Sequence, residues 1–268
     1  MSNARTTGFR GGLVVAVIMA IFALIRYYSS SEYNPVLGEK QIVALSVDQE
    51  IALGLQSAPQ MAQQHGGLHP DQKTQQYIKQ VGHKIVSSSL AKSSEYEFDF
   101  HLLADPQTVN AFALPGGQVF ITLALYNQLE NEDQLAGVLG HEIGHVIGRH
   151  SAQRIAKQQL AEGLSGAAVL ATYDPNNPAT TQTAQIAAVI TNLVTMKYGR
   201  EDELQSDELG VRFMSEAGYD PNALIGVMQI LKAAAGPNRQ PEFFSSHPDP
   251  DNRVENIKVA IDKYYTGK

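Results

Sequence analysis

The sequence contains no cysteine. This absence excludes thiol nucleophiles, disulfide bonds, cysteine-ligated zinc sites and a lipid-modified N-terminal cysteine. Any metal site in this chain must therefore be built from histidine, aspartate or glutamate side chains.

Clustered positive charge is also missing. The formal net charge of the 268 residues is −7, charged residues make up 18% of the chain, and no block of lysine and arginine occurs. A surface that neutralises nucleic-acid phosphates is therefore not expected. With 43% hydrophobic residues, the chain can bury one sizeable core, which predicts one main domain.

Two common catalytic motifs are absent as well. The stretch from Gly163 to Ala167 lacks one glycine of the nucleophile elbow, and no phosphate-binding Gly-Lys-Ser/Thr pattern occurs. Serine-hydrolase and P-loop chemistry are therefore not indicated.

Only one hydrophobic run approaches membrane-spanning length. Residues Gly11 to Ile25 carry no charge, follow Arg5 and Arg10, and end at an arginine and two tyrosines. The run is shorter than the roughly 20 residues that cross a bilayer comfortably, but aromatic and basic rims make a span feasible. We expect an uncleaved anchor within residues 1–30, with its basic end in the cytoplasm.

This anchor sets the expected organisation of the chain. A linker over residues 31–45 leads into one main domain over residues 46–268. The protein is then a single-pass membrane protein whose main domain lies on the periplasmic, extracytoplasmic side. The alternative is a signal peptide that is cleaved near the serine run at 29–31, which would yield a secreted protein.

The periodicity beyond the linker predicts an α+β fold that is mainly α. Ser46 and Gln49 form a capping-box pattern at the start of a helix. His65 and His69 are four residues apart, but two intervening glycines break the helix, so we interpret both as loop histidines. The expected elements are helices to about 64 and over about 70–89, a strand over 96–103, and short strands over 110–114 and 118–122 around a Pro-Gly-Gly turn.

One helix carries the motif His141-Glu142-x-x-His145. Apolar residues at helical spacing predict a buried helix from Glu132 to about Leu160. Four residues turn about 400° on a helix, so both imidazoles lie on one face and can reach one Zn²⁺. Glu142 lies one position along, where it can take a proton from water without binding the metal. The alternative, two packed histidines beside a buried glutamate, leaves a carboxylate without hydration.

His150 suggests a third histidine ligand of the metzincin type, but it comes one residue too early. On a continuous helix it lies about 180° from His141 and points away from the metal. We expect a packed or hydrogen-bonded histidine near the end of the helix.

A third ligand is expected from the acidic stretch that follows. Glu203 and Asp207 lie four residues apart on a helix predicted from about Glu201 to Ala217. A glutamate can bind zinc there while an aspartate one turn later accepts the N–H of a ligating imidazole, as in gluzincins. Spacing alone leaves open a solvated acidic face, because Asp202 and Glu208 are also acidic.

Four ordered motifs resemble a known peptidase family. They are Asn110 to Gly117, Leu129 to His145, Arg200 to Asp207 and Ser246 to Arg253. The chain is similar, over about residues 46–264, to the M48 zinc metallopeptidases, which include the bacterial membrane protease HtpX, the CAAX prenyl protease and periplasmic chaperone-proteases. The family often has serine and alanine where this chain has Gly199 and Ser206.

The resemblance implies a gluzincin fold, with a small β-sheet beside the HExxH helix, and specific roles. Glu203 becomes the third ligand of one Zn²⁺ per chain, and Asp207 orients a ligand. His247 and Arg253 face the metal from a C-terminal loop, where we expect them to stabilise the developing oxyanion. His247 can alternatively hold the metal's open position at rest. The sheet edge that receives an extended substrate corresponds to Asn110, Ala111, Phe112 and Ala113.

Two further apolar stretches fall below spanning length. Leu160 to Ala171 and Ile186 to Met196 are expected to form a helical pair that packs against the catalytic helices and partly covers the cleft. The chain therefore resembles the single-tether branch of the family, and prenylated substrates are not expected.

The expected function is a zinc metalloendopeptidase that removes unfolded or misfolded proteins in the cell envelope. Zinc polarises the scissile carbonyl and acidifies a water, and Glu142 acts as general base. The alternative is a non-catalytic chaperone or scaffold with a structural zinc site. Glu142 argues against it, because a structural site needs no general base.

Overall fold

The computed structural model describes residues 3–172, 198–235, 241–248 and 252–267. Its contacts divide the chain into two compact units. We call residues 1–34, 39–44 and 152–196 the N-terminal unit, and residues 35–38, 45–151 and 197–268 the core unit. The predicted segment Ile186 to Met196 lies outside the described residues.

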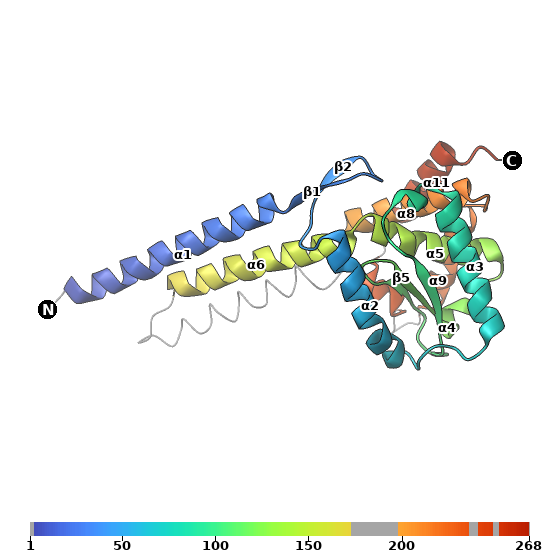
Figure 1. The fold of residues 1–268 in the computed structure, drawn as a ribbon, viewed down its shortest axis with the longest axis horizontal. Helices are drawn as coiled ribbons and strands as arrows, with labels where there is room; N and C mark the ends of the chain where they lie inside the picture. Colours follow the sequence, from blue (N-terminus) through green and yellow to red (C-terminus); the bar gives the residue numbers. More distant parts are fainter. Residues whose placement is uncertain (1–2, 173–197, 236–240, 249–251, 268) are drawn as a thin grey trace. The chain divides into compact units, whose positions relative to one another are not determined.

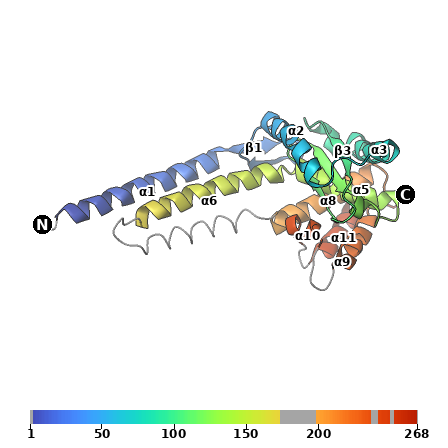
Figure 2. The same ribbon diagram turned by 90° about the horizontal axis from the view of Figure 1, so that it is seen from below.

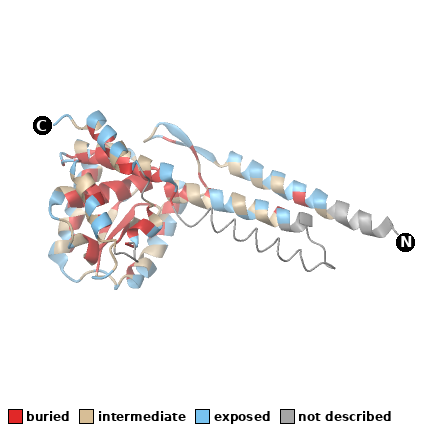
Figure 3. Cartoon of the chain, turned by 180° about the vertical axis from the view of Figure 1, so that it is seen from behind, coloured by how far each residue is buried: buried red, intermediate tan, exposed pale blue. Residues whose placement is uncertain are grey.

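The N-terminal unit contains the long helix α1 (Asn3–Ser29) and most of α6 (His150–Thr172). Among the described residues, one helical stretch, Gly12–Ser29, is long and apolar enough to cross a membrane. Its apolar side chains are mostly exposed, so α1 is largely blue in Figure 3. An exposed apolar surface of this kind is typical of a membrane-embedded or partner-bound helix.

Two segments singled out in the sequence fall in this unit. The residues expected to form a linker contain an antiparallel hairpin of β1 (Ser31–Asn34) and β2 (Glu39–Ile42). The helix predicted over Leu160 to Ala171 is present within α6, but Gly163 faces Ala23 of α1. This segment belongs to the N-terminal unit, where the small Gly163 allows close contact with α1.

The core unit begins with helices that match the capping signals. Ser46 accepts from the backbone of Gln49, and the Gln49 side chain accepts from the backbone of Ser46, so the predicted capping box is confirmed. Helix α2 (Val47–Gln64) follows, and then α3 (Gln72–Ser88). His65 and His69 lie outside both helices, as expected.

A three-stranded sheet has the order β3-β5-β4. Strand β3 (Asp99–Leu103) is parallel to β5 (Gln118–Thr122), and β4 (Ala111–Ala113) is antiparallel to β5. The predicted hairpin of β4 and β5 is confirmed, and the predicted first strand begins three residues later than 96. Alternation along the strands gives the sheet two apolar faces, one toward the main core and one toward α2.

Helices dominate the rest of this unit. They are α4 (Leu123–Tyr126), α5 (Glu132–Ile147), α8 (Arg200–Glu216), α9 (Ala223–Ala233), α10 (Phe243–Ser246) and α11 (Arg253–Tyr264), with one 3-10 turn, Leu90–Ser93 (Figure 1). Helix α11 packs against α8 and α9, and Figure 2 shows these helices in one region of the core unit. The predicted α+β, mainly helical fold class is confirmed.

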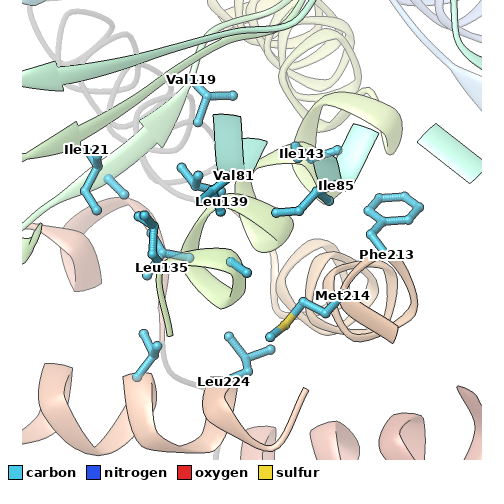
Figure 4. Packing of buried hydrophobic residues seen from close by; sticks show 14 of the residues in the cluster. Val81, Ile85, Val119, Ile121, Leu135, Leu139, Ile143, Phe213, Met214 and Leu224 are labelled. Carbon is cyan, nitrogen blue, oxygen red and sulfur yellow. The ribbon is translucent and has the colours of Figure 1, made fainter. Parts of the chain in front are cut away.

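Helix α5 is the centre of the main core. Every residue from Gln134 to Ile147 is buried. Figure 4 shows Leu135, Leu139 and Ile143 of α5 surrounded by apolar side chains from α3, β5, α8 and α9. The labelled neighbours are Val81, Ile85, Val119, Ile121, Phe213, Met214 and Leu224. This packing holds the backbone of the HExxH motif rigid.

The predicted helix from Glu132 to Leu160 is wrong in one respect. Helix α5 ends at Ile147, and a separate helix, α6, begins at His150. Arg149 between them has a φ of 54°, a left-handed conformation that no continuous α-helix contains.

Candidate metal centre and active site

His141 and His145 lie on one face of α5, as their spacing predicts. Their Nε2 atoms are 3.0 Å apart, and both side chains are buried. Burial holds the pKa of His145 well below its ordinary value, so this imidazole is neutral. Burial alone would lower the pKa of His141, but the carboxylates of Asp207 and Glu203 raise it to about 9. Two Nε2 atoms that converge on one point suit a metal ion, and metal binding releases the proton of a ligating imidazole.

Helix α8 brings a carboxylate to the same point. Glu203 Oε2 lies 3.5 Å from His141 Nε2, and Glu203 Oε1 lies 3.3 Å from His145 Nε2. Burial alone would raise the pKa of Glu203, but His247 and the two other histidines hold it well below its ordinary value. The carboxylate is therefore ionised and available as a ligand.

A glycine allows α8 to approach α5 this closely. A Cβ atom on Gly144 would lie 2.7 Å from Ser206 Oγ and 2.8 Å from the Ser206 carbonyl oxygen. Ser206 donates a hydrogen bond of 2.5 Å to the carbonyl of His141. Ser206, one of the two departures from the family pattern, therefore ties together the two helices that carry the candidate ligands.

His247, which follows α10, completes a group of four. Its Nδ1 lies 3.1 Å from Glu203 Oε1, 3.2 Å from His145 Nε2 and 3.4 Å from His141 Nε2. The four candidate ligand atoms all lie within 4.8 Å of one another, and all four residues are buried. The ring of Phe243 stacks on His247 at 4.4 Å. The structure thus places His247 among the candidate ligands.

Asp207 and Arg253 lie behind the ligands. Asp207 Oδ1 is 2.8 Å from His141 Nδ1, the position expected for a residue that orients this ring. Arg253 donates to both Asp207 oxygens at 2.6 and 2.9 Å, and its Nη1 lies 3.3 Å from Glu203 Oε2. Burial alone would raise the pKa of Asp207, but the charge of Arg253 lowers it.

Arg253 is buried and paired with two acids. Its guanidinium is 1% exposed and pairs with Asp207 and Glu203. The bidentate pair suits a residue that holds the two acids in place.

Glu142 is buried beside the ligand group. It is 1% exposed, and within the described part of the chain neither of its carboxylate oxygens has a hydrogen-bond partner. Oε1 lies 3.7 Å from His247 Nε2, and burial raises the pKa of Glu142. A buried carboxyl with free lone pairs and a raised pKa is suited to accept and return a proton.

The predicted substrate edge lies at the rim of the sheet. Among the described strands none pairs with the outer side of β4 (Ala111–Ala113), and Asn110 precedes it. Asn110 is 6% exposed, and its Oδ1 has no hydrogen-bond partner among the described residues. The ring of Phe112 stacks on Phe120 at 5.0 Å, which anchors the strand to β5.

Tyr198 at the site was not predicted, whereas His150 is buried and hydrogen-bonded, as expected. Tyr198 stacks on the ring of His145 at 4.1 Å, and its hydroxyl lies 3.2 Å from Ser151 Oγ. His150 Nδ1 lies 2.9 Å from His145 Nδ1. The sequence offered one signal for Tyr198, its place just before the Arg200 to Asp207 motif, and none for the contact of His150.

Comparisons with known proteins agree with this geometry. The family model described as Peptidase family M48 matches residues 72–261. The chain is 32% identical over 230 residues to a beta-barrel assembly-enhancing protease of Yersinia pestis, covering 84% of the chain and 46% of that protein.

Two other relatives give similar values. A beta-barrel assembly-enhancing protease of Escherichia coli K12 is 29% identical over 87% of the chain and 48% of its own length. The mitochondrial metalloendopeptidase OMA1 of Schizosaccharomyces pombe is 29% identical over 87% of the chain and 67% of its own length. The chain thus spans about half the length of the bacterial relatives it matches.

Proposed function

The chain belongs to peptidase family M48, and from this premise we propose that it is a zinc metalloendopeptidase acting on unfolded or misfolded proteins of the cell envelope. The observation that carries the proposal is the convergence of His141, His145 and Glu203 beside Glu142, whose oxygens have no hydrogen-bond partner among the described residues. The names of the relatives, proteases that enhance β-barrel assembly and a mitochondrial metalloendopeptidase, support envelope quality control.

The donor set fits zinc. Two imidazole nitrogens and one carboxylate oxygen are the protein ligands found in catalytic zinc sites, which keep a fourth position for water or substrate. We propose one Zn²⁺ per chain, held by His141, His145 and Glu203. When bound, zinc would polarise the scissile carbonyl and acidify a water.

The chain's own residues then have distinct tasks. Glu142 accepts the proton of the attacking water and returns it to the leaving amine, so no covalent intermediate is needed. Asp207 orients His141, and Arg253 holds Asp207 and Glu203 in place. The edge at Asn110 to Ala113 aligns an extended substrate through its backbone, which tolerates many side chains.

The geometry supports a specific role for His247, that of a latch on the metal. Its Nδ1 reaches all three other ligand atoms, so in the described state it takes the position that a fourth ligand would take. This arrangement supports the latch over the oxyanion role favoured by the sequence. The latch must move away before a substrate carbonyl can enter.

The rival function is a non-catalytic chaperone or scaffold with structural zinc. We expect the purified protein to cleave unfolded casein, to lose this activity on chelation, and to regain it with stoichiometric Zn²⁺. Gel analysis of casein fragments beside the metal content measures both properties. If zinc-loaded protein leaves casein and other unfolded proteins intact, the rival function is favoured. If cleavage survives complete metal removal, the protein is not a metallopeptidase.

We also propose that α1 anchors the protein and that the core unit lies outside the cytoplasm. Arg5 and Arg10 precede the apolar run and favour a cytoplasmic N-terminus. Deleting residues 1–28 should release soluble, active protein, because the proposed catalytic residues all belong to the core unit. Fractionation with protease protection of intact cells or spheroplasts measures this topology. A mature N-terminus near Glu32 in cells would identify a cleaved signal in place of an anchor.

A further inference from the structure

The junction between α5 and α6 is a strained turn that is fixed on both sides. Arg149 carries a side chain yet has a φ of 54°, and such conformations persist where the surroundings hold them in place. Its Nε donates to Glu50 Oε2 at 3.0 Å, and its Nη2 donates to the carbonyl of Leu45 at 2.6 Å. Arg149 is 5% exposed and Glu50 is 2% exposed. Contacts with Glu50 and Leu45 therefore hold this turn in place within the core unit.

On a continuous helix the His150 side chain would point away from the proposed metal site, but this turn directs it toward His145. His150 is fully buried, and its Nδ1 lies 2.9 Å from Nδ1 of His145. Its other nitrogen, Nε2, lies 2.8 Å from Oε1 of Gln205 on α8. A chain of close polar contacts thus runs from Gln205 through His150 to the far side of a proposed metal ligand.

The protons along this chain can be placed from chemistry. Gln205 Oε1 is a carbonyl oxygen and can only accept, so His150 Nε2 carries a hydrogen and donates it. A neutral imidazole with a hydrogen on Nε2 has a lone pair on Nδ1. His150 Nδ1 therefore accepts, and the hydrogen of the 2.9 Å contact belongs to His145 Nδ1.

The proposed metal contact requires the same tautomer of His145, independently of the contact with His150. The His145 nitrogen that faces His141 and Glu203 is Nε2, and a metal-binding nitrogen must carry a lone pair. A neutral His145 then has its hydrogen on Nδ1. The two lines of argument start at opposite ends of the chain of contacts and place the same proton.

We propose that His150 is a positioning residue for the metal site, which accepts a hydrogen bond from His145 and holds His145 Nε2 as the ligand atom. Asp207 does the same for His141 with a charged acceptor. The inference rests on the metal assignment proposed above. Removal of such orienting partners typically weakens metal binding about 10–100-fold.

Two substitutions separate the hydrogen bond from the packing of the ring. Phenylalanine in His150→Phe keeps an aromatic ring but offers no acceptor. Asparagine in His150→Asn places a carbonyl oxygen close to the position of the imidazole Nδ1. We expect the zinc dissociation constant to rise about 10–100-fold for His150→Phe and to stay within about threefold of wild type for His150→Asn.

Zinc affinity is measured by competition with a chromogenic chelator on the full-length protein, with thermal unfolding of the metal-free forms as the folding control. Wild-type affinity in a folded His150→Phe variant overturns the proposal, and so does equal weakening in both variants, which would indicate packing. If wild-type protein binds no zinc, the metal assignment itself fails.

Nitrogen-15 NMR of the histidine side chains in zinc-loaded wild-type protein gives a readout that does not depend on folding of a variant. We expect His145 to carry its hydrogen on Nδ1 and His150 to carry its hydrogen on Nε2. A hydrogen on Nδ1 of His150 would reverse the direction of the bond and overturn the proposal.

Discussion

Glu142→Gln is expected to leave zinc bound and to abolish detectable hydrolysis of an unfolded substrate. Glutamine has nearly the same shape but cannot accept the proton of the attacking water, and loss of such a group costs about 10²–10⁴-fold in turnover. Because Glu142 is buried and its oxygens have no hydrogen-bond partner among the described residues, its neutral replacement should not destabilise the fold. Turnover, metal content and the unfolding temperature are measured on the same preparation.

Glu203→Gln should give a different result, because Glu203 is proposed to bind the metal. A neutral amide oxygen is a weaker ligand for zinc than a carboxylate, so stoichiometric zinc and activity should be lost together. Glu201, an exposed acid two residues away on α8, supplies the matched control, and Glu201→Gln should change neither property. The ligand assignment is wrong if Glu142→Gln empties the site, or if Glu203→Gln keeps full zinc and full turnover.

His247→Ala is expected to raise turnover on unfolded casein, with zinc retained. A latch that occupies the fourth position in about 90% of molecules leaves only about one molecule in ten competent, so its removal should raise turnover on the order of tenfold. His141, His145 and Glu203 remain to hold the metal in this variant. Steady-state cleavage rates beside metal content measure the effect, and His69→Ala, a loop histidine outside the ligand group, serves as the control.

A fall in turnover for His247→Ala would instead support the oxyanion role that the sequence favoured for His247. A histidine that stabilises the oxyanion contributes about a hundredfold or more, so its loss would slow turnover by that factor without loss of zinc. A rate that does not change would exclude both roles. The two roles place the same ring at the same metal, so only the direction of the change distinguishes them.

Local parts of the fold could be predicted because their causes are local. The capping box of Ser46 and Gln49 acts across three residues, and the β4–β5 hairpin depends on a short turn. His141 and His145 share a face because of helix geometry alone, so their Nε2 atoms meet once α5 forms. The apolar spacing of α5 likewise predicted its burial.

The choice of the third ligand needed more than local spacing. Asp202, Glu203, Asp207 and Glu208 all lie on α8. Helical spacing singled out the pair Glu203 and Asp207 but left a solvated acidic face as the alternative. Resemblance to a family pointed to Glu203 and Asp207. The structure supplies a physical distinction, since Gly144 lets α8 approach α5 until Glu203 lies within 3.3 to 3.5 Å of both histidines.

By itself, the sequence determined the spacing of the two histidines, the place of the glutamate proposed as general base and the absence of any thiol ligand. Only the tertiary structure supports the roles proposed for His150 and Arg253. A left-handed turn at Arg149, held by Glu50 from α2, directs His150 back to His145, and no helical periodicity contains that turn. Arg253 comes from the last helix and lies behind the ligands because two buried carboxylates require a cation between them. Such placements depend on contacts between residues far apart in the chain, which local spacing does not encode.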